Sequence, residues 1–435
     1  MTRIPVTTRR LVAVVALSAL AVVRLPAAEL TPVEKLILEA IDGRRDAAIG
    51  LLARSIDIPS ATENHEGVKR VGQLYADELR ALGFETRWVD QAQVGRAGHL
   101  VAERHGTKGR RVLLIGHLDT VLQGERFRRE GARVYGSGSA DMKSGNAIAI
   151  EALRALHAAG RLEDRQVIVV FTGDEEDTGR PYDVSRAALI EAASRSDVAL
   201  AFEGNEPGTA VVGRRGFSSW RLEVTGSQGH SSGIFGNDRG AGAVFEAARI
   251  LSAFYNELRE PYLTFNPSVI VGGTDVNYDP PAFSGSATGK ANVVPRAVVV
   301  EGDMRFLSRD QLERARDKMR AIVSAHLPKT SAVISFTDGM PSMAPTAGNR
   351  ALLATLDQVS QDIGTGPIVV HDPSKRGAGD ISFVADRVPG LDGLGGWGDL
   401  DHAPGEWTDL DAMLKLTKHA ALLMDRLIWS DPPRK

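Results

Sequence analysis

Three short, almost uninterrupted apolar runs divide the first half of the chain. They cover residues 112–115, 167–171 and 198–202. Runs of this length and composition are typical of strands that are buried on both faces of a sheet. The stretches between them, including 144–159 and 185–193, have the apolar spacing of helices. This alternation predicts an α/β fold, a layered domain with a central, mostly parallel sheet.

Two helices are predicted ahead of the first apolar run. Thr31 is a good N-cap, Pro32 suits the first helical position, and Glu34 completes a capping box. The second helix is expected over residues 67–82, and Gly83 marks its end. The domain is therefore expected to begin with helices rather than with a strand.

The pattern changes near residue 213. Strand-like alternation over 218–224 is followed by a helical run at 241–258 and by strand-like segments at 268–271 and 298–306. A further helix is expected between Ser308, its N-cap, and Pro328. Strands joined to two helices in this way predict a small α+β domain inserted into the α/β domain. Helices at 349–363 and 409–429 then return the chain to the first pattern.

The predicted organisation has four segments. They are a signal peptide at 1–28, the first part of the α/β domain at 29–212, the inserted domain at 213–330 and the second part of the α/β domain at 331–435. In the leader, Arg9 and Arg10 precede an apolar run at 11–23, and small residues follow. That run is shorter than the roughly 20 residues of a membrane span. We expect export to the periplasm or medium, with an uncleaved anchor as the alternative.

Composition narrows the chemistry that the chain can perform. The 435 residues include no Cys, which excludes disulfides and thiolate metal ligands, so any metal must be held by His and carboxylates. The formal net charge is −3, and it becomes −7 once the leader, with four Arg and no acid, is removed. This balance argues against nucleic acid as a partner.

Acids and histidines follow all three apolar runs. In open α/β sheets, ligands bind beyond the carboxyl ends of the strands. Residues of this kind also occur just before the helix at 144–159 and in a Gly-rich loop near residue 402. The set comprises His117, Asp119, Asp141, Glu175, Glu176, Glu203 and His402. Two His and several carboxylates suit zinc or a similar divalent ion.

Each of these residues alone has a simpler explanation. A single His at a strand end is more often structural, Asp141 could cap a helix, and Glu203 could be solvated. The acidic run at 174–177 could be a solvated loop. Residues 136–141 begin like a dinucleotide-binding G-x-G-x-x-G motif, but Asp141 occupies the third Gly position and would repel a pyrophosphate. Independent accidents would not place acids and His at successive strand ends, so the joint pattern favours a metal site.

Five motifs carry a family resemblance. GHLDTV, GSGSADMKSG, TGDEEDTG, AFEGN and DHAPGEW resemble, in this order, the metal motifs of the co-catalytic di-zinc metallopeptidases. That family includes glutamate carboxypeptidase, aminoacylase, acetylornithine deacetylase and succinyl-diaminopimelate desuccinylase. The resemblance spans nearly all of the chain after the leader. Ser137 and Ser144 replace a usual Arg and Gly, and neither change removes a ligand.

The resemblance implies two Zn²⁺ ions, or other divalent ions such as Co²⁺ or Mn²⁺. Asp141 would bridge the two metals. The remaining ligands would be His117 and Glu203 at one metal and Glu176 and His402 at the other. Asp119 would orient His117, and Glu175 would be the general base.

The resemblance also covers the inserted domain, which it implies is a ferredoxin-like lid and dimerisation domain. His230, in TGSQGHSSG, would stabilise the oxyanion, often from the other subunit of a homodimer. Asn292 and Arg305 would hold the free carboxylate of the substrate, since the guanidinium fork binds carboxylates bidentately. A surface His and a strand ion pair are the alternatives for His230 and Arg305. Arg215 and the 377–380 loop are candidates for the pocket wall.

The expected function is that of an exported, zinc-dependent carboxypeptidase of the glutamate carboxypeptidase type. It would act on a peptide or N-acyl amino acid, cleaving an amide bond next to a free C-terminal carboxylate. The alternatives are an N-acyl amino acid deacylase, a non-catalytic relative used as a binding module, and a dimetal phosphoesterase, which would not require His230. Three acids stay open: Asp174 as an acid that supports the metal ligands or a structural acid, Asp177 as a solvated or capping acid, and Glu406 as a supporting or solvated acid.

Overall fold

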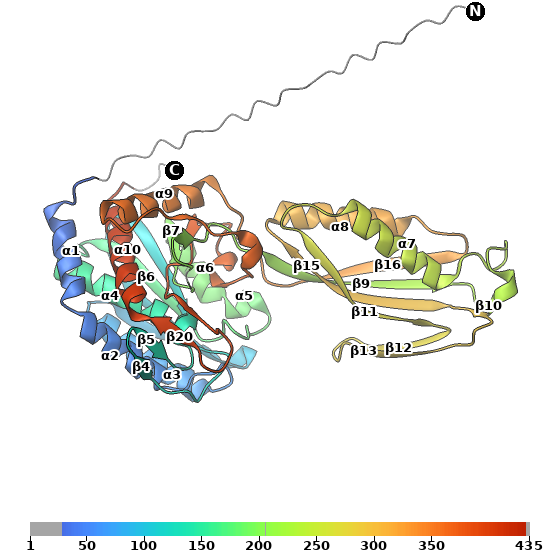
Figure 1. Ribbon diagram of the computed structural model, residues 1–435, viewed down its shortest axis with the longest axis horizontal. Helices are drawn as coiled ribbons and strands as arrows, with labels where there is room; N and C mark the ends of the chain where they lie inside the picture. Colours follow the sequence, from blue (N-terminus) through green and yellow to red (C-terminus); the bar gives the residue numbers. More distant parts are fainter. Residues whose placement is uncertain (1–27, 205, 432–435) are drawn as a thin grey trace, which may run out of the picture.

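A computed structural model describes residues 28–204 and 206–431 and shows a larger lobe beside an elongated smaller lobe (Figure 1). The predicted leader lies outside the described residues, apart from Ala28. Within residues 28–204 and 206–431, no helix has both the length and the apolarity that crossing a bilayer requires.

The larger lobe is built on a six-stranded mixed sheet. In spatial order the strands are β1 (Glu85–Gln91), β2 (Arg96–Arg104), β6 (Arg165–Thr172), β3 (Lys108–His117), β7 (Val198–Ala201) and β18 (Gly390–Leu391). From β6 to β18 all neighbours are parallel, whereas β1, β2 and β6 pair antiparallel. The prediction of parallel central strands is correct. The antiparallel edge formed by β1 and β2 was not predicted. β1 escaped prediction because it is half exposed and lacks a continuous apolar run.

Alternate residues of the central strands face two different cores. Val112 and Leu114 of β3 pack with helices α1 (Pro32–Asp42), α2 (Arg45–Ile56), α3 (His65–Arg80), α4 (Ser144–Ala158), α9 (Ala347–Asp362) and α10 (Leu410–Ile428). Leu113 and Ile115 pack on the other face with α6 (Ala187–Ser194), which follows the single turn α5 (Tyr182–Ser185). A strand with two buried faces needs apolar residues at every position, which is why these strands appear as unbroken runs.

Helix ends follow the predicted signals closely. The capping box of α1 is present, with the Thr31 and Glu34 side chains each bonded to the other residue's backbone N–H. The helix α3 begins two residues before the predicted start, because Asn64 accepts a hydrogen bond from the Gly67 N–H and caps it. The helix α2 was not predicted. Its apolar periodicity is weak, and its N-cap makes no side-chain hydrogen bond.

The smaller lobe has the chain order β-α-β-β-α-β. Its elements are β9 (Gly216–Gly226), α7 (Gly242–Glu257), β11 (Thr264–Gly273), β15 (Ala297–Phe306), α8 (Arg309–Ser324) and β16 (Thr330–Asp338). The strands form an antiparallel sheet in the order β11-β15-β9-β16, and α7 and α8 share its hydrophobic core. Two hairpin-like pairs extend it: β12 (Asp275–Asp279) with β13 (Ser284–Thr288), and β10 (Gly229–His230) with β14 (Val293–Val294).

Short strands connect distant parts of the larger lobe. A second sheet has the order β19 (Gly398–Asp399), β20 (Trp407–Asp409), β5 (Arg133–Tyr135) and β4 (Arg128–Glu130). It places the loop between β19 and β20 beside the segment that leads into α4. A parallel pair, β8 (Thr209–Ala210) with β17 (Val369–Val370), joins the two parts of the α/β domain again.

Substitutions at two glycines, Gly145 and Gly50, test how closely α4 approaches the end of β7. At Gly145, in the first turn of α4, an added Cβ would meet the Phe202 carbonyl oxygen at 2.0 Å; at Gly50, in α2, it would meet nothing within 4 Å. We expect Gly145→Ala to lower the thermal unfolding midpoint, at a cost of about 1–3 kcal/mol. Gly50→Ala should hold or raise the midpoint, gaining up to about 1 kcal/mol of helix propensity. Equal shifts in the two variants would contradict the close packing.

Candidate metal centre

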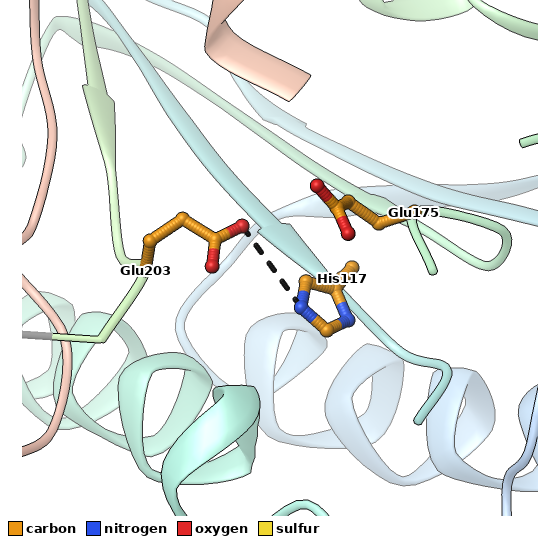
Figure 2. A group of neighbouring side chains, drawn as sticks. All are labelled: His117, Glu175 and Glu203. Atoms are coloured by element: carbon orange, nitrogen blue, oxygen red, sulfur yellow. Dashed lines mark ion pairs between the residues drawn. The ribbon is translucent and has the colours of Figure 1, made fainter. Parts of the chain in front are cut away.

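The carboxyl ends of three adjacent strands bring predicted site residues together. His117 is the last residue of β3, Glu175 lies in the loop after β6, and Glu203 follows β7. Since β6, β3 and β7 are parallel neighbours, their carboxyl ends meet at one edge of the sheet. Figure 2 shows the three side chains converging there, with 3.9 Å between His117 Nε2 and Glu203 Oε1.

His117 is buried and has a defined tautomer. Its Nδ1 lies 2.9 Å from the main-chain oxygen of Asp119 and, because a carbonyl can only accept, Nδ1 carries the proton. Nε2 then faces the acids, 3.0 Å from Asp141 Oδ1. Burial opposes protonation of the ring, but the hydrogen bonds with Asp119 and Asp141 and the charges of Glu203 and Asp141 outweigh it and raise the His117 pKa well above its usual value. A neutral ring with Nδ1 protonated is the form in which Nε2 can bind a metal.

Asp119 holds three segments of the site in place. Its carboxylate accepts hydrogen bonds from the Thr62 hydroxyl at 2.8 Å, the Glu175 N–H at 3.0 Å and the Glu176 N–H at 3.1 Å. Oδ1 lies 3.5 Å from His117 Nδ1. The Asp119 pKa is lowered, because its bond to His117 and its other hydrogen bonds outweigh its complete burial. Asp119 therefore fixes both His117 and the loop after β6.

Asp141, Glu176 and His402 form the other half of the cluster. His402 Nε2 lies 3.1 Å from Asp141 Oδ2 and 3.2 Å from Glu176 Oε2. The two oxygens of Asp141 therefore face two different histidines. The contacts with Asp141 and Glu176 raise the pKa of His402 to about 11. This histidine is half exposed, at the open side of the cluster.

The acids of the cluster repel one another. Burial raises the pKa of Glu203 to about 8, and the charge of Asp141 adds to the rise. Burial and the charge of Glu203 raise the pKa of Glu175 well above its usual value. Glu176 Oε1 is buried and has no hydrogen-bond partner among the described residues. A bound cation would satisfy that oxygen and offset the repulsion.

The donor set fits a divalent metal. Two groups of residues offer ligand atoms within 4.8 Å of one another, namely His117 with Glu175 and Glu203, and His117 with Asp141 and Glu176. Imidazole nitrogens and carboxylate oxygens are ligands for zinc and for ions such as Co²⁺ and Mn²⁺. The orphaned oxygen of Glu176 and the double approach to Asp141 support two neighbouring ions rather than one.

Glu406 supports the Asp141 loop from outside the cluster. Its buried carboxylate accepts hydrogen bonds from the backbone N–H groups of Gly138 and Ala140, both at 2.7 Å, and of Asp141 at 2.9 Å. Burial raises its pKa to about 7, against these hydrogen bonds. Of the two alternatives left open by the sequence, the structure selects the supporting acid.

The remaining acids of the 174–177 run have different roles. Asp174 is fully buried, and its Oδ1 lies 2.5 Å from Nη1 of Arg186, whose Nε bonds to Asp380 at 2.7 Å. Asp174 is therefore a structural acid that holds the loop in place through its buried ion pair with Arg186. Asp177 is exposed and forms an ion pair with Arg96. Sequence reasoning missed Arg186 and Thr62, because neither lies in an acidic or His-rich motif.

Three predicted residues lie outside the cluster within the described chain. His230 is in β10, at the end of the smaller lobe far from the larger lobe (Figure 1), and it bonds to Ser232 at 2.8 Å. Asn292 lies beside it, accepting the Ser231 N–H at 2.9 Å. Arg305 is near the other end of that lobe, where its Nε bonds to Asp303 at 3.1 Å. Within one subunit, this arrangement does not bring His230 to the cluster.

Known proteins resemble this chain over most of its length. A model of peptidase family M20/M25/M40 matches residues 113–426. Carboxypeptidase G2 of Pseudomonas sp. (strain RS-16) is 25% identical over 403 residues, or 90% of this chain and 92% of that protein. Succinyl-diaminopimelate desuccinylase of Paracoccus denitrificans (strain Pd 1222) is 28% identical over 400 residues, or 86% and 97% of the two chains.

Solved structures share the fold. Aminopeptidase PepT from Bacillus cereus ATCC 10987 superposes with a TM-score of 0.70 at 17% identity, covering 88% of this chain and 98% of that one. The YXEP protein of Bacillus subtilis, described as a dinuclear metal binding peptidase from the M20 family, gives a TM-score of 0.61 at 16% identity, with 89% and 99% covered. Both likenesses span nearly the full length of the solved chains.

The support from Glu406 can be measured as metal affinity. In Glu406→Gln an amide N–H would face the N–H groups that the carboxylate now accepts, and the Asp141 loop would shift. We expect the affinity for Zn²⁺ to fall roughly 10- to 100-fold, as for other residues that orient metal ligands. Titration against a competing chelator measures this. Glu130→Gln, at an exposed glutamate of β4, is the matched control. An unchanged affinity in Glu406→Gln would contradict the assignment.

Proposed function

The chain belongs to peptidase family M20/M25/M40, and from this premise we propose that it is a di-metal carboxypeptidase. It would hydrolyse a peptide or amide bond next to a free C-terminal carboxylate. The observation that carries the proposal is the convergence of two His and four acids at the sheet edge, with both oxygens of Asp141 facing a histidine. Family membership supports a metal-dependent hydrolase, and the carboxypeptidase activity is the finer proposal.

We assign the ligands as the resemblance implies. Asp141 would bridge the two ions, His117 and Glu203 would bind one, and Glu176 and His402 would bind the other. Two bound divalent ions would polarise the scissile carbonyl and lower the pKa of the attacking water. The adjacency of Glu175 and Glu176 supports separate roles, because Asp119 fixes both backbones while neighbouring side chains diverge.

Glu175 is proposed as the general base. It would accept a proton from the attacking water and deliver it to the leaving amine. Its raised pKa, caused mainly by burial and by Glu203, makes it a stronger base than a solvated glutamate. Asp119 would keep His117 in the tautomer with Nε2 free, which agrees with the hydrogen bond at Nδ1.

The smaller lobe would supply the residues that complete the substrate-binding site. We propose the inserted domain, predicted at 213–330, as a lid and dimerisation domain. Its last strand, β16, extends it to Asp338, and the β-α-β-β-α-β order supports a ferredoxin-like unit. Arg305 and Asn292 would bind the α-carboxylate, and His230 would stabilise the oxyanion. Since His230 and Asn292 lie at the far end of the lobe, we propose that both act in the site of the second subunit of a homodimer.

The main alternative is an N-acyl amino acid deacylase. It would use the same metal chemistry on a different acyl group, and the relatives include both a carboxypeptidase and a desuccinylase at similar identity. Predicted export weighs mildly against a role in cytosolic biosynthesis. The predicted leader at 1–28 and the catalytic segments 29–212 and 331–435 are part of the same proposal, except that residues 331–338 belong to strand β16 of the smaller lobe.

The function is tested by turnover of dipeptides, acyl-glutamates and N-acetyl amino acids, with and without divalent cations. We expect metal-dependent hydrolysis of at least one class. The class that is hydrolysed fastest would distinguish a carboxypeptidase from a deacylase. Glu175→Ala should lower kcat by roughly 10²- to 10⁴-fold while both metals stay bound. Glu176→Ala should weaken one metal site. If none of the three substrate classes is hydrolysed, or if both variants keep full activity, the proposal is wrong.

Subunit mixing tests the position of His230. Glu175→Ala and His230→Ala would each be inactive alone. In a mixed dimer, the subunit carrying His230→Ala keeps Glu175 and would receive an intact His230 from its partner. We therefore expect co-refolded mixtures to recover about a quarter of wild-type activity, since half of the dimers would hold one complete site. A mixture as inactive as two inactive parents would show that His230 acts within its own subunit, and an active His230→Ala parent would show that it does not act at all.

A further inference from the structure

The two lobes meet at one end of the smaller lobe (Figure 1), and a cavity lies at this junction. Its volume is about 400 Å³, within the range of about 300–1,000 Å³ that is usual for small-molecule sites. Its walls come from the smaller lobe, from the linker 338–344 at the end of β16, and from residues 382–386 of the larger lobe. Of the described residues that line it, none is a proposed metal ligand or a predicted substrate contact.

The walls of the cavity are largely apolar. Phe217 of β9 lines it from the smaller lobe, and Phe383, at the end of the 3-10 turn η5 (Asp380–Phe383), lines it from the larger lobe. Met340 and Pro341 of the linker lie between these two walls in the sequence and line the same cavity. All four side chains are partly exposed, so their surfaces are accessible to a ligand. Such walls suit an aromatic ring, which packs well against other rings.

One exposed cation of the lining has no partner. Arg309, the first residue of α8, forms no ion pair and no side-chain hydrogen bond with the residues that the structure describes. The three acids of the lining each have an arginine neighbour: Glu313 and Asp338 share Arg316, and Asp386 lies 3.9 Å from Arg387. The charge that remains available to a ligand is therefore positive, and a guanidinium suits a carboxylate.

The cavity also adjoins the supports of the metal cluster. The turn η5 carries Asp380, which accepts a hydrogen bond from Arg186 at 2.7 Å, and Arg186 in turn pairs with Asp174 in the loop after β6. On the opposite wall, the guanidinium carbon of Arg305 lies 5.1 Å from the centroid of the Phe217 ring. A ligand in the cavity would thus contact segments that continue into the proposed active site from both lobes.

We propose that this cavity is a binding site for a small aromatic carboxylate. The ring would pack between Phe217 and Phe383, and the carboxylate would pair with Arg309. Because the ligand would contact both lobes and the linker, its binding would favour the lobe arrangement of this structure over any other. The inference does not rest on the proposed function, since binding can be measured without turnover.

The test is calorimetric titration of the full chain with three probes of similar shape. They are 3-phenylpropionate, its neutral amide 3-phenylpropanamide, and the cation 2-phenylethylamine. We expect 3-phenylpropionate to bind most tightly, because only this probe can pair with Arg309. Arg309→Gln should weaken its binding roughly 10-fold and leave that of the amide unchanged. Lys318→Gln removes an exposed positive charge from the same helix, outside the cavity lining, and should change neither.

Two further measurements locate the bound probe. Ser342→Trp places a large side chain in the cavity and should abolish binding, with the thermal unfolding midpoint as a check that the variant folds. Hydrogen exchange at 338–344 and 382–386 should slow when 3-phenylpropionate is bound to the wild-type protein, because both segments line the cavity. Unchanged exchange in both segments would overturn the restraint on the lobes and the site itself.

Arg305→Gln excludes binding in the proposed active site. Binding of 3-phenylpropionate that is lost in Arg305→Gln but kept in Arg309→Gln would place the probe at the substrate contacts and overturn the inference. Equal binding of acid and amide, tighter binding of the amine, or no binding of any probe at millimolar concentration would overturn it as well. Binding that depends on Arg309 in a protein without amide hydrolysis would support this site while rejecting the proposed function.

Discussion

The carboxylate of Asp119 is the interaction on which the rest of the site depends. It links the segment containing Thr62 to the backbone of Glu175 and Glu176, and its residue also fixes the tautomer of His117. These groups come from the chain before β1, the end of β3 and the loop after β6. One buried acid therefore sets the relative positions of a metal-ligand candidate and a base candidate that belong to different strands.

Holding so many acids together requires support from outside the cluster. Arg186 forms ion pairs with Asp174, in the loop after β6, and with Asp380. Glu406 accepts hydrogen bonds from three N–H groups of the Asp141 loop. Buried charges of this kind contribute little net stability, but removal of one partner is strongly destabilising. The cluster is thus held in shape before a cation arrives, and the cation would relieve the remaining repulsion.

The sequence predicted the parts of the site that depend on local pattern. Unbroken apolar runs identified β3, β6 and β7, and their parallel order follows from the α/β alternation, so His117, Glu175 and Glu203 could be expected at one edge. The partners Thr62 and Arg186 could not be predicted, since their roles arise only when distant segments pack together. The position of His230 depends on how the lobes and subunits are arranged, and no local pattern contains that information.

Residues of the site come from sequence segments before and after the inserted lobe. The ribosome therefore completes them in two stages. A ribosome completes His117, Asp141, Glu176 and Glu203 long before it reaches His402 and Glu406. Until then the Asp141 loop lacks Glu406, which accepts the hydrogen bonds of its N–H groups, and the cluster lacks His402. A nascent chain would therefore expose an unfinished, strongly acidic edge. Metal capture would come late, after the last helix has folded back onto the sheet.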